Sequence, residues 1–192
     1  MSETPAAIDT FADGHVPCFA IYDGPVTADE LKKLLKLEAH PCEGGWFAET
    51  WRSEEAIPKS ALPERYPAAR SAGTAIYYLL EPHTFSELHR LASDEIFHFY
   101  LGDPVEMLQL WPDGSVRTEI LGHDLSAGMR VQLTVPKYVW QGSRLLPGGS
   151  FALLGCTVGP GFDYADYESG KRVELIREYP DAEEMIRVLT HD

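Results

Sequence analysis

Cysteine is scarce in this chain of 192 residues, and the few cysteines are not arranged as a site. Cys18, Cys42 and Cys156 are odd in number and form no Cys-x-x-Cys pair. Their spacing argues against a disulfide framework and against a zinc site built from thiolates. Few, unpaired cysteines are typical of a reducing compartment, so we expect a cytoplasmic protein in which Cys156 is a small buried hydrophobe.

Basic residues are also few. The chain has 16 Lys and Arg against 30 Asp and Glu, which gives a formal net charge of −14. Its densest basic group, Lys32, Lys33 and Lys36, lies on one short predicted helix. Because a surface that binds phosphates needs clustered basic side chains, neither nucleic acid nor an anionic membrane is expected as a partner.

Long apolar runs are absent as well. No segment approaches the roughly 20 apolar residues that a membrane-spanning helix needs. Residues 1–19 carry no basic residue ahead of an apolar block, so no secretory signal is predicted. The length fits one domain. We expect residues 1–26 to be a flexible extension and residues 27–192 to form a single domain.

The patterns that are present indicate mostly β structure. Thr27, followed three positions later by Glu30, forms a capping box that predicts a helix at 28–38. The turn sequence at 112–114 is typical of a hairpin. The predicted strands are 46–52, 72–80, 95–101, 105–111, 116–121, 130–135 and 150–158, and a last helix is predicted at 181–189. Short strands at this spacing favour an antiparallel sandwich or barrel.

The segment 86–102 carries the strongest chemical signal. It sets His89, Glu95 and His98 within ten residues, on a segment patterned as a strand. Buried imidazole and carboxylate groups are costly unless they are paired, bound to a metal or used in proton transfer. These three side chains are therefore candidate catalytic residues. The alternatives are a satisfied core histidine with two surface groups, or an ion pair between Glu95 and an arginine, Arg52 or Arg90.

Several motifs, spread from about residue 30 to residue 190, carry a family resemblance. They are His40-Pro41 with Glu43-Gly44-Gly45-Trp46-Phe47 and Glu49-Thr50-Trp51-Arg52; the segment 86–102; Leu121-Gly122-His123-Asp124 with Gly128; Val135-Pro136 with Trp140-Gln141; and Gly155-Cys156-Thr157-Val158 with Pro160-Gly161-Phe162-Asp163. Together they resemble the cupin superfamily, in its branch called domain of unknown function 985, or Cupin 5. Cys42 departs from that pattern, because it interrupts an otherwise continuous His-Pro-Glu-Gly-Gly.

The resemblance implies an all-β fold, the cupin jelly-roll β-barrel (a double-stranded β-helix), with a short N-terminal helix and a C-terminal helix. It also implies a pocket for a small-molecule ligand inside the barrel and a homodimer. It does not imply a particular reaction.

The general cupin pattern supplies metal ligands at four positions, and this chain keeps two of them. His89 stands at the first His position and Glu95 at the Glu position, whereas Leu91 and Gln141 stand at the other two. Divalent transition metals favour several His, Cys or carboxylate ligands, so no cofactor is expected. The alternative is a divalent metal held by His89, Glu95 and Gln141. His98 is a poor substitute, because strand alternation turns it away from Glu95.

A second likeness concerns mechanism. Residues 44–49 resemble a segment of the dTDP-sugar 3,5-epimerases, metal-free cupins that remove a proton next to a carbonyl, although Gly44 stands where those enzymes have an arginine. The likeness assigns three roles, namely the base (His89 or His98), the orienting carboxylate (Glu95) and the proton donor (Tyr78 or its neighbour Tyr77).

Further residues are expected to contact the ligand, and these are Arg52, Trp140, Gln141, Phe97 and Glu49. The guanidinium of Arg52 offers a bidentate fork for a carboxylate or a phosphate. Trp140 lies at the expected barrel mouth. Three functions stay open, namely a metal-free epimerase or isomerase of a small sugar or keto acid, a binding module without chemistry, and a metal-dependent enzyme.

Overall fold

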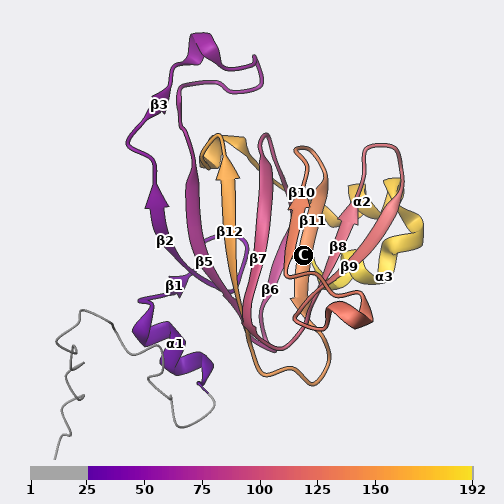
Figure 1. Cartoon of the computed structure of the whole chain (residues 1–192). Coiled ribbons are helices and arrows are strands. Elements are labelled where there is room, and N and C mark those ends of the chain that lie inside the picture. The colour runs from indigo at the N-terminus through magenta and orange to yellow at the C-terminus, as the bar shows by residue number, and fades with distance from the viewer. Residues whose placement is uncertain (1–25, 192) are drawn as a thin grey trace, which may run out of the picture.

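The computed structural model describes residues 26–191, which form two antiparallel sheets that face each other (Figure 1). The larger sheet has the order β1-β2-β5-β12-β7-β10, the smaller has β13-β6-β11-β8-β9, and β3 pairs with β4. The strands are β1 (Glu38–Ala39), β2 (Trp46–Arg52), β3 (Ala56–Ile57), β4 (Arg70–Ser71), β5 (Thr74–Leu80), β6 (Phe85–Leu91), β7 (Asp94–Gly102), β8 (Val105–Leu110), β9 (Val116–Leu121), β10 (Gln132–Val135), β11 (Trp140–Leu145), β12 (Ala152–Gly159) and β13 (Tyr167–Ser169). The helices are α1 (Ala28–Leu34), α2 (Arg172–Glu178) and α3 (Glu183–Val188). The extension predicted at 1–26 and Cys18 lie outside the described residues, apart from Val26.

An apolar core fills the space between the two sheets, as the jelly-roll prediction requires. Its buried members come from both sheets and include Tyr78, Leu80, Phe97, Phe99, Val105, Met107, Leu121, Leu145, Leu154 and Cys156. Strand alternation decides which residues enter it. On β7, Glu95, Phe97 and Phe99 are buried and face this space, whereas Tyr100 is exposed on the outer face.

Helix α1 begins as predicted but ends early. The Thr27 hydroxyl accepts from the Glu30 N–H, and the Glu30 carboxylate accepts from the Thr27 N–H, so the capping box is present. The helix stops at Leu34, not at residue 38, and Lys36 takes a φ of 54°. This turn brings Leu37 into one buried cluster with Leu31. Burial of the Leu37 side chain favours the early end of the helix over one more helical turn.

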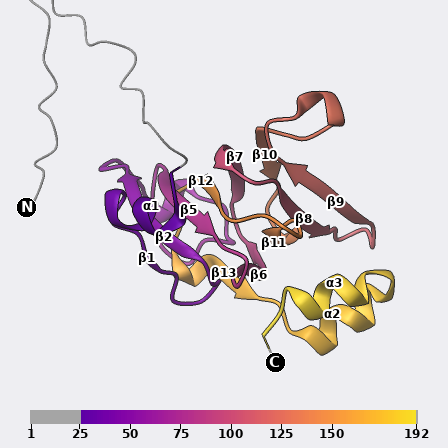
Figure 2. The same cartoon turned by 90° about the horizontal axis from the view of Figure 1, so that it is seen from below.

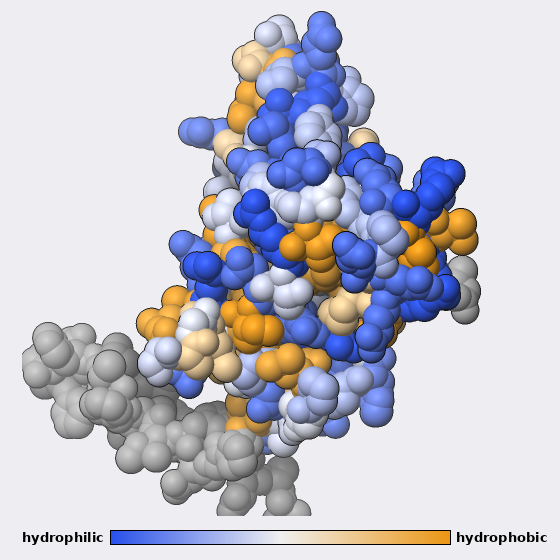
Figure 3. All heavy atoms as spheres, turned by 90° about the vertical axis from the view of Figure 1, so that its right-hand side faces the viewer, coloured by the Kyte–Doolittle hydropathy of each residue, from blue (hydrophilic) through white to orange (hydrophobic). Residues whose placement is uncertain are grey.

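The C-terminal helices cover the outer face of the smaller sheet (Figure 2). The helix predicted at 181–189 is present as α3, and α2 was not predicted. The buried cluster between helices and sheet contains Leu88, Leu108, Leu110, Trp140, Leu175, Ile186 and Leu189. The surface on this side is mainly hydrophilic, with hydrophobic residues in small separate groups (Figure 3). Within residues 26–191, no helix is both long and apolar enough to cross a membrane.

The segment 86–102, patterned as a strand, contains two strands: the strand predicted at 95–101 is present as β7, whereas β6 was not among the predicted strands. Strand β6 ends at Leu91 and β7 begins at Asp94, and the two strands belong to different sheets. The hydroxyl of Ser93 holds the turn between them, because it donates to the carbonyl of Pro160 at 3.1 Å and lies 2.9 Å from the Tyr66 hydroxyl. A residue on β6 therefore meets a residue on β7 across the barrel.

Candidate functional site

A pocket of about 370 Å³ opens between the sheets, at the end where β2 and β12 finish and β5 and β7 begin. We call it the barrel pocket. It is lined by His40, Glu43, Phe47, Glu49, Arg52, Thr74, Ile76, Leu91, Glu95, Cys156, Val158, Phe162, Asp163 and Tyr164. The mixture of apolar walls and a few charged groups is typical of a site for a small molecule.

Four polar side chains, three of them buried and one (Glu43) half-buried, meet at the inner end of the barrel pocket, and we call them the His89 cluster. They are Glu43 from the loop before β2, His89 from β6, Glu95 from β7 and Gln141 from β11. Nε2 of His89 lies 3.9 Å from Oε1 of Glu43 and 3.9 Å from Oε2 of Glu95. Nε2 of Gln141 donates to Oε2 of Glu95 and lies 3.4 Å from Nε2 of His89. One imidazole thus faces two carboxylates.

The ring of His89 is held rigidly and carries a proton. Its Nδ1 lies 2.8 Å from the carbonyl oxygen of Glu87 and donates to it, and the ring of Tyr167 stacks on it with 5.0 Å between centroids. The side chain is 2% exposed. Burial disfavours the charged form, but the negative charges of Glu43 and Glu95 outweigh it and raise the pKa of His89 to about 9. At neutral pH this group is an imidazolium.

Glu43 is positioned by a tight loop in which His40 acts as an acceptor. Nδ1 of His40 accepts the backbone N–H of Glu43 at 2.9 Å and that of Cys42 at 3.3 Å. The proton of the neutral ring therefore lies on Nε2, which is 3.7 Å from Oε1 of Glu43. Burial lowers the pKa of His40, with a smaller opposing effect from the charge of Glu43. His40 is thus a neutral N–H donor aimed at the His89 cluster.

The glycine after Glu43 makes this loop possible. Gly44 has a φ of 89°, and a Cβ at this position would lie 2.5 Å from the carbonyl oxygen of Phe85. The carbonyl of Gly44 in turn accepts the Tyr78 hydroxyl at 2.8 Å. Sequence reasoning missed the roles of His40 and Glu43, although the His40-Pro41 and Gly44-Gly45 pairs were the signal of a constrained loop.

The mouth of the barrel pocket carries a second charged group. The guanidinium of Arg52 donates to both carboxylate oxygens of Glu49, at 3.0 and 2.6 Å, and its Nη1 donates to the carbonyl of Phe162 at 3.1 Å. Asp163 and Tyr164 complete the rim. The Phe162 N–H donates to the Thr74 hydroxyl at 3.0 Å, which fixes one end of this rim segment.

A buried ion pair fixes the other end of the rim segment. Arg70 donates to both oxygens of Asp166 at 2.6 Å, and the two side chains are only 3% and 4% exposed. Burial opposes the charge of Arg70, but the hydrogen bond to Asp166 dominates and raises its pKa. The pair ties the chain before β5 to the chain after β12.

Comparison with known proteins decides the family. A model of the cupin superfamily (DUF985) matches residues 29–170, which is more than half of the chain. The chain belongs to this cupin branch. It is 32% identical over 134 residues to the uncharacterized protein YML079W of Saccharomyces cerevisiae, a match that spans 65% of this chain and 66% of the yeast protein, just under two thirds of its length.

Two solved structures resemble this cupin along nearly their whole length. Protein SO0799 from Shewanella oneidensis is 35% identical with a TM-score of 0.77, and covers 87% of this chain and 99% of its own. A hypothetical protein from Leishmania major is 31% identical with a TM-score of 0.78, and covers 87% of this chain and 100% of its own. These likenesses support the cupin jelly-roll fold.

The structure brings together several residues that the sequence singled out in this cupin. His89 and Glu95 lie in one cluster with Gln141, and Glu49 and Arg52 lie at the pocket mouth. The arginines weighed as partners of Glu95 are engaged elsewhere, since Arg52 pairs with Glu49 and Arg90 pairs with Glu168. Cys156 is buried in the wall, as expected for a small hydrophobe.

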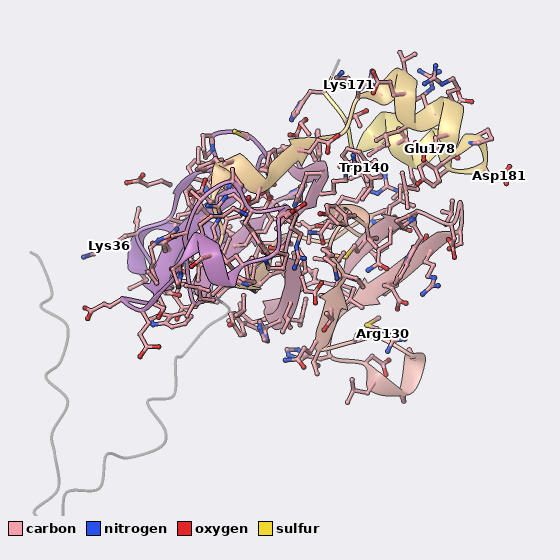
Figure 4. All side chains as sticks on the ribbon, turned by 90° about the horizontal axis from the view of Figure 1, so that it is seen from above. Lys36, Arg130, Trp140, Lys171, Glu178 and Asp181 are labelled. Carbon is pink, nitrogen blue, oxygen red and sulfur yellow. The ribbon has the colours of Figure 1, made fainter. Side chains whose placement is uncertain are left out.

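Other predicted residues lie elsewhere. His98 is on the outer face of β7, where its Nε2 lies 3.1 Å from the Thr157 hydroxyl. Trp140 lies beside the C-terminal helices (Figure 4). The guanidinium of Arg90 lies over its ring. Phe97 belongs to the apolar core and does not line the pocket. Tyr78 is 1% exposed, and its hydroxyl donates a hydrogen bond to the carbonyl of Gly44. Side chains alternate between the two faces of each strand, and the sequence alone did not show which of these faces points into the barrel.

A tightly bound divalent metal does not fit the His89 cluster of this cupin. The amide nitrogen of Gln141 donates to Glu95 and cannot be a ligand, and its Oε1 is not turned toward that carboxylate. Among residues 26–191, no group of three or more His, Cys, Asp or Glu side chains has the geometry of a metal site.

Proposed function

We propose that this cupin binds a small polar molecule in the barrel pocket and moves a proton on it, as an epimerase or isomerase does next to a carbonyl. The observation that carries the proposal is the pair of carboxylates, Glu43 and Glu95, which line the pocket in front of a single buried imidazolium. Titratable groups brought together in a cleft are typical of acid–base sites, and here the pKa of His89 is raised while that of His40 is lowered.

The geometry favours carboxylates as the groups that meet the ligand. Glu43 and Glu95 line the barrel pocket, whereas His89 lies behind them and is already protonated. The sequence had suggested the reverse order, with His89 as base and Glu95 as its orienting partner. In the proposed order, Glu95 removes the proton from the carbon and Nε2–H of His40 donates to the developing oxygen anion. Glu95 then returns the proton from its own side to the adjacent carbon, while the hydroxyl proton of the ligand passes to the other oxygen, which completes an isomerisation and restores both groups.

His89 is a positioning residue in this scheme. Its positive charge lies 3.9 Å from one oxygen of each carboxylate, so it keeps two negative groups stable in a confined space. Gln141 adds a hydrogen bond to Glu95 that fixes the orientation of the carboxylate.

Proton exchange in deuterated water tests the proposal. The wild-type protein is incubated with simple aldoses, ketoses and 2-keto acids, and deuterium uptake next to the carbonyl is followed by NMR. We expect Glu95→Gln to lower the exchange rate by about 10²–10⁴-fold, the usual contribution of a general base. The matched control is Glu106→Gln, whose carboxylate pairs with Arg144 outside the pocket. Equal exchange in wild type and Glu95→Gln would refute the proposal.

A binding module without chemistry is the second candidate, and one observation favours it. Each carboxylate of the cluster already accepts a hydrogen bond, Glu95 from Gln141 and Glu43 from the Ser86 hydroxyl at 3.3 Å. Such a satisfied network can be purely structural. Ligand binding in the pocket without any isotope exchange would establish this candidate.

A further inference from the structure

We propose that the barrel pocket selects a positively charged small molecule, one that carries an ammonium or amidinium group. This inference rests on the proposed function, since it concerns the ligand of the same pocket. Four carboxylates line the pocket, and these are Glu43, Glu49, Glu95 and Asp163. Among the described lining residues, Arg52 is the single permanent cation.

Arg52 does not provide a free anion site. Its guanidinium is already engaged by both oxygens of Glu49 and by the carbonyl of Phe162. A carboxylate or phosphate on a ligand would have to displace Glu49 and would then face the remaining carboxylates. The expectation that Arg52 binds an anion therefore gives way to its role as the ion-pair partner of Glu49.

The remaining charge favours a cation. The imidazolium of His89 and the guanidinium of Arg52 offset two of the four carboxylates, so two negative charges stay in excess around the pocket. The excess negative charge is present both at the inner end of the pocket, where Glu43 and Glu95 lie, and at its rim, where Asp163 lies. Charges act strongly in a cavity that holds little water, so a cation gains and an anion is repelled.

Aromatic side chains are a second, independent feature that favours a cation in the pocket. Phe47, Phe162 and Tyr164 line the pocket. Phe162 and Tyr164 meet edge to face with 5.0 Å between centroids, which leaves ring faces turned in different directions. Aromatic faces attract cations, and rings combined with carboxylates are a common way to bind ammonium groups.

The inner end also offers an unused acceptor. Oε1 of Gln141 is buried and has no hydrogen-bond partner among the described residues, while its Nε2 holds Glu95. A buried acceptor left without a donor is costly. Gln141 contacts Glu95 from behind the lining residues, so an N–H group on a ligand would have to reach past Glu95 to meet this acceptor.

Isosteric probes that differ in charge test the inference directly. NMR titration of the whole chain compares choline with its neutral isostere 3,3-dimethylbutan-1-ol and with the anion 3,3-dimethylbutanoate. We expect the Kd of choline to be lower than that of the neutral probe by about tenfold or more, and the anion to bind most weakly.

Charge variants then locate the effect. Glu49→Gln combined with Asp163→Asn should weaken choline binding by about fivefold or more, and Arg52→Gln should strengthen it, because each changes the charge of the rim. Glu119→Gln, on the remote strand β9, is the matched control, since the Glu119 carboxylate pairs with Arg130 outside the pocket. That variant should bind choline as wild type does. Thermal unfolding of each variant confirms that it is folded.

The outcomes separate this inference from the proposed function. Ile76→Phe, which places a ring in the pocket wall, serves as a blocking variant. If the neutral or anionic probe binds as tightly as choline, and Ile76→Phe abolishes that binding, the pocket stands and the charge selectivity is refuted. Weaker choline binding by Arg52→Gln refutes it too. If no probe binds, or if Ile76→Phe changes nothing, the proposed pocket itself is wrong.

Discussion

Loss of the proton from His89 should make the protein less stable as the pH rises. The pKa of His89 is about 9 in the folded protein, against an ordinary value of 6.5 in the unfolded chain. Between these values the folded state binds more protons than the unfolded state, so the free energy of unfolding falls with pH. The contribution is fully present below 6.5 and is lost as the pH rises through about 9.

The structure sets the size of this effect. A pKa raised from 6.5 to about 9 corresponds to about 3 kcal/mol, at about 1.4 kcal/mol for each unit. The charged and titratable groups that face His89 from the neighbouring elements are Glu43, His40, Glu95 and Tyr167. Burial, and then the charge of Glu43, raises the pKa of Tyr167, so this phenol stays protonated in the same window. The lowered pKa of His40 acts below 6.5, outside the window.

Denaturant unfolding from about pH 6 to about pH 10 measures the effect. Wild type should lose about 3 kcal/mol across this range through His89, and His89→Gln should lack this slope although it is less stable throughout. His83→Gln, at an exposed position, is the control that should keep the wild-type slope. Equal slopes in wild type and His89→Gln, or an NMR titration that places the His89 pKa at or below 6.5, would refute the reasoning.

Two further predictions concern the backbone and the buried ion pair. Gly44→Ala should lower the free energy of unfolding clearly more than Gly114→Ala. Both positions have positive φ, so the backbone strain is similar. Only at Gly44 would the new Cβ meet a backbone oxygen, since nothing lies within 4 Å of a Cβ at Gly114. Urea unfolding of both variants checks this, and equal costs would contradict it. Arg70→Met should cost about 3–5 kcal/mol, because it leaves the Asp166 carboxylate buried without its partner. Adding Asp166→Asn should restore part of that loss, and no recovery would contradict the ion-pair explanation.

Local patterns predicted most of the fold. Strands β2 and β9 match the predicted ranges 46–52 and 116–121, and the capping box of Thr27 is present, because alternation and capping depend on neighbours in the sequence. The break between β6 and β7 was missed, since its hydroxyl contacts come from residues distant in the chain, such as Tyr66.

The site was only partly predictable, for a related reason. His89 and Glu95 were found because buried charge is conspicuous in an apolar segment. Glu43 was not, because its carboxylate reaches His89 through a loop whose shape depends on Gly44 and on acceptance by His40. Trp140 was predicted at the mouth of the pocket, but it packs under the C-terminal helices. Strand alternation separates the two faces of a sheet, but it does not show which face a helix will cover.

The doubly anchored rim has a consequence for exchange of ligand with solvent. The backbone of the rim segment is attached at Phe162 to Thr74 and at Asp166 to Arg70, so it cannot swing aside as a flap without breaking a buried ion pair. Entry and exit should then depend on the rotation of Tyr164 and on brief separation of Arg52 from Glu49, both at least partly exposed. Side-chain movements of this kind are fast, so we expect the entrance to admit small molecules quickly and to exclude bulky ones by size.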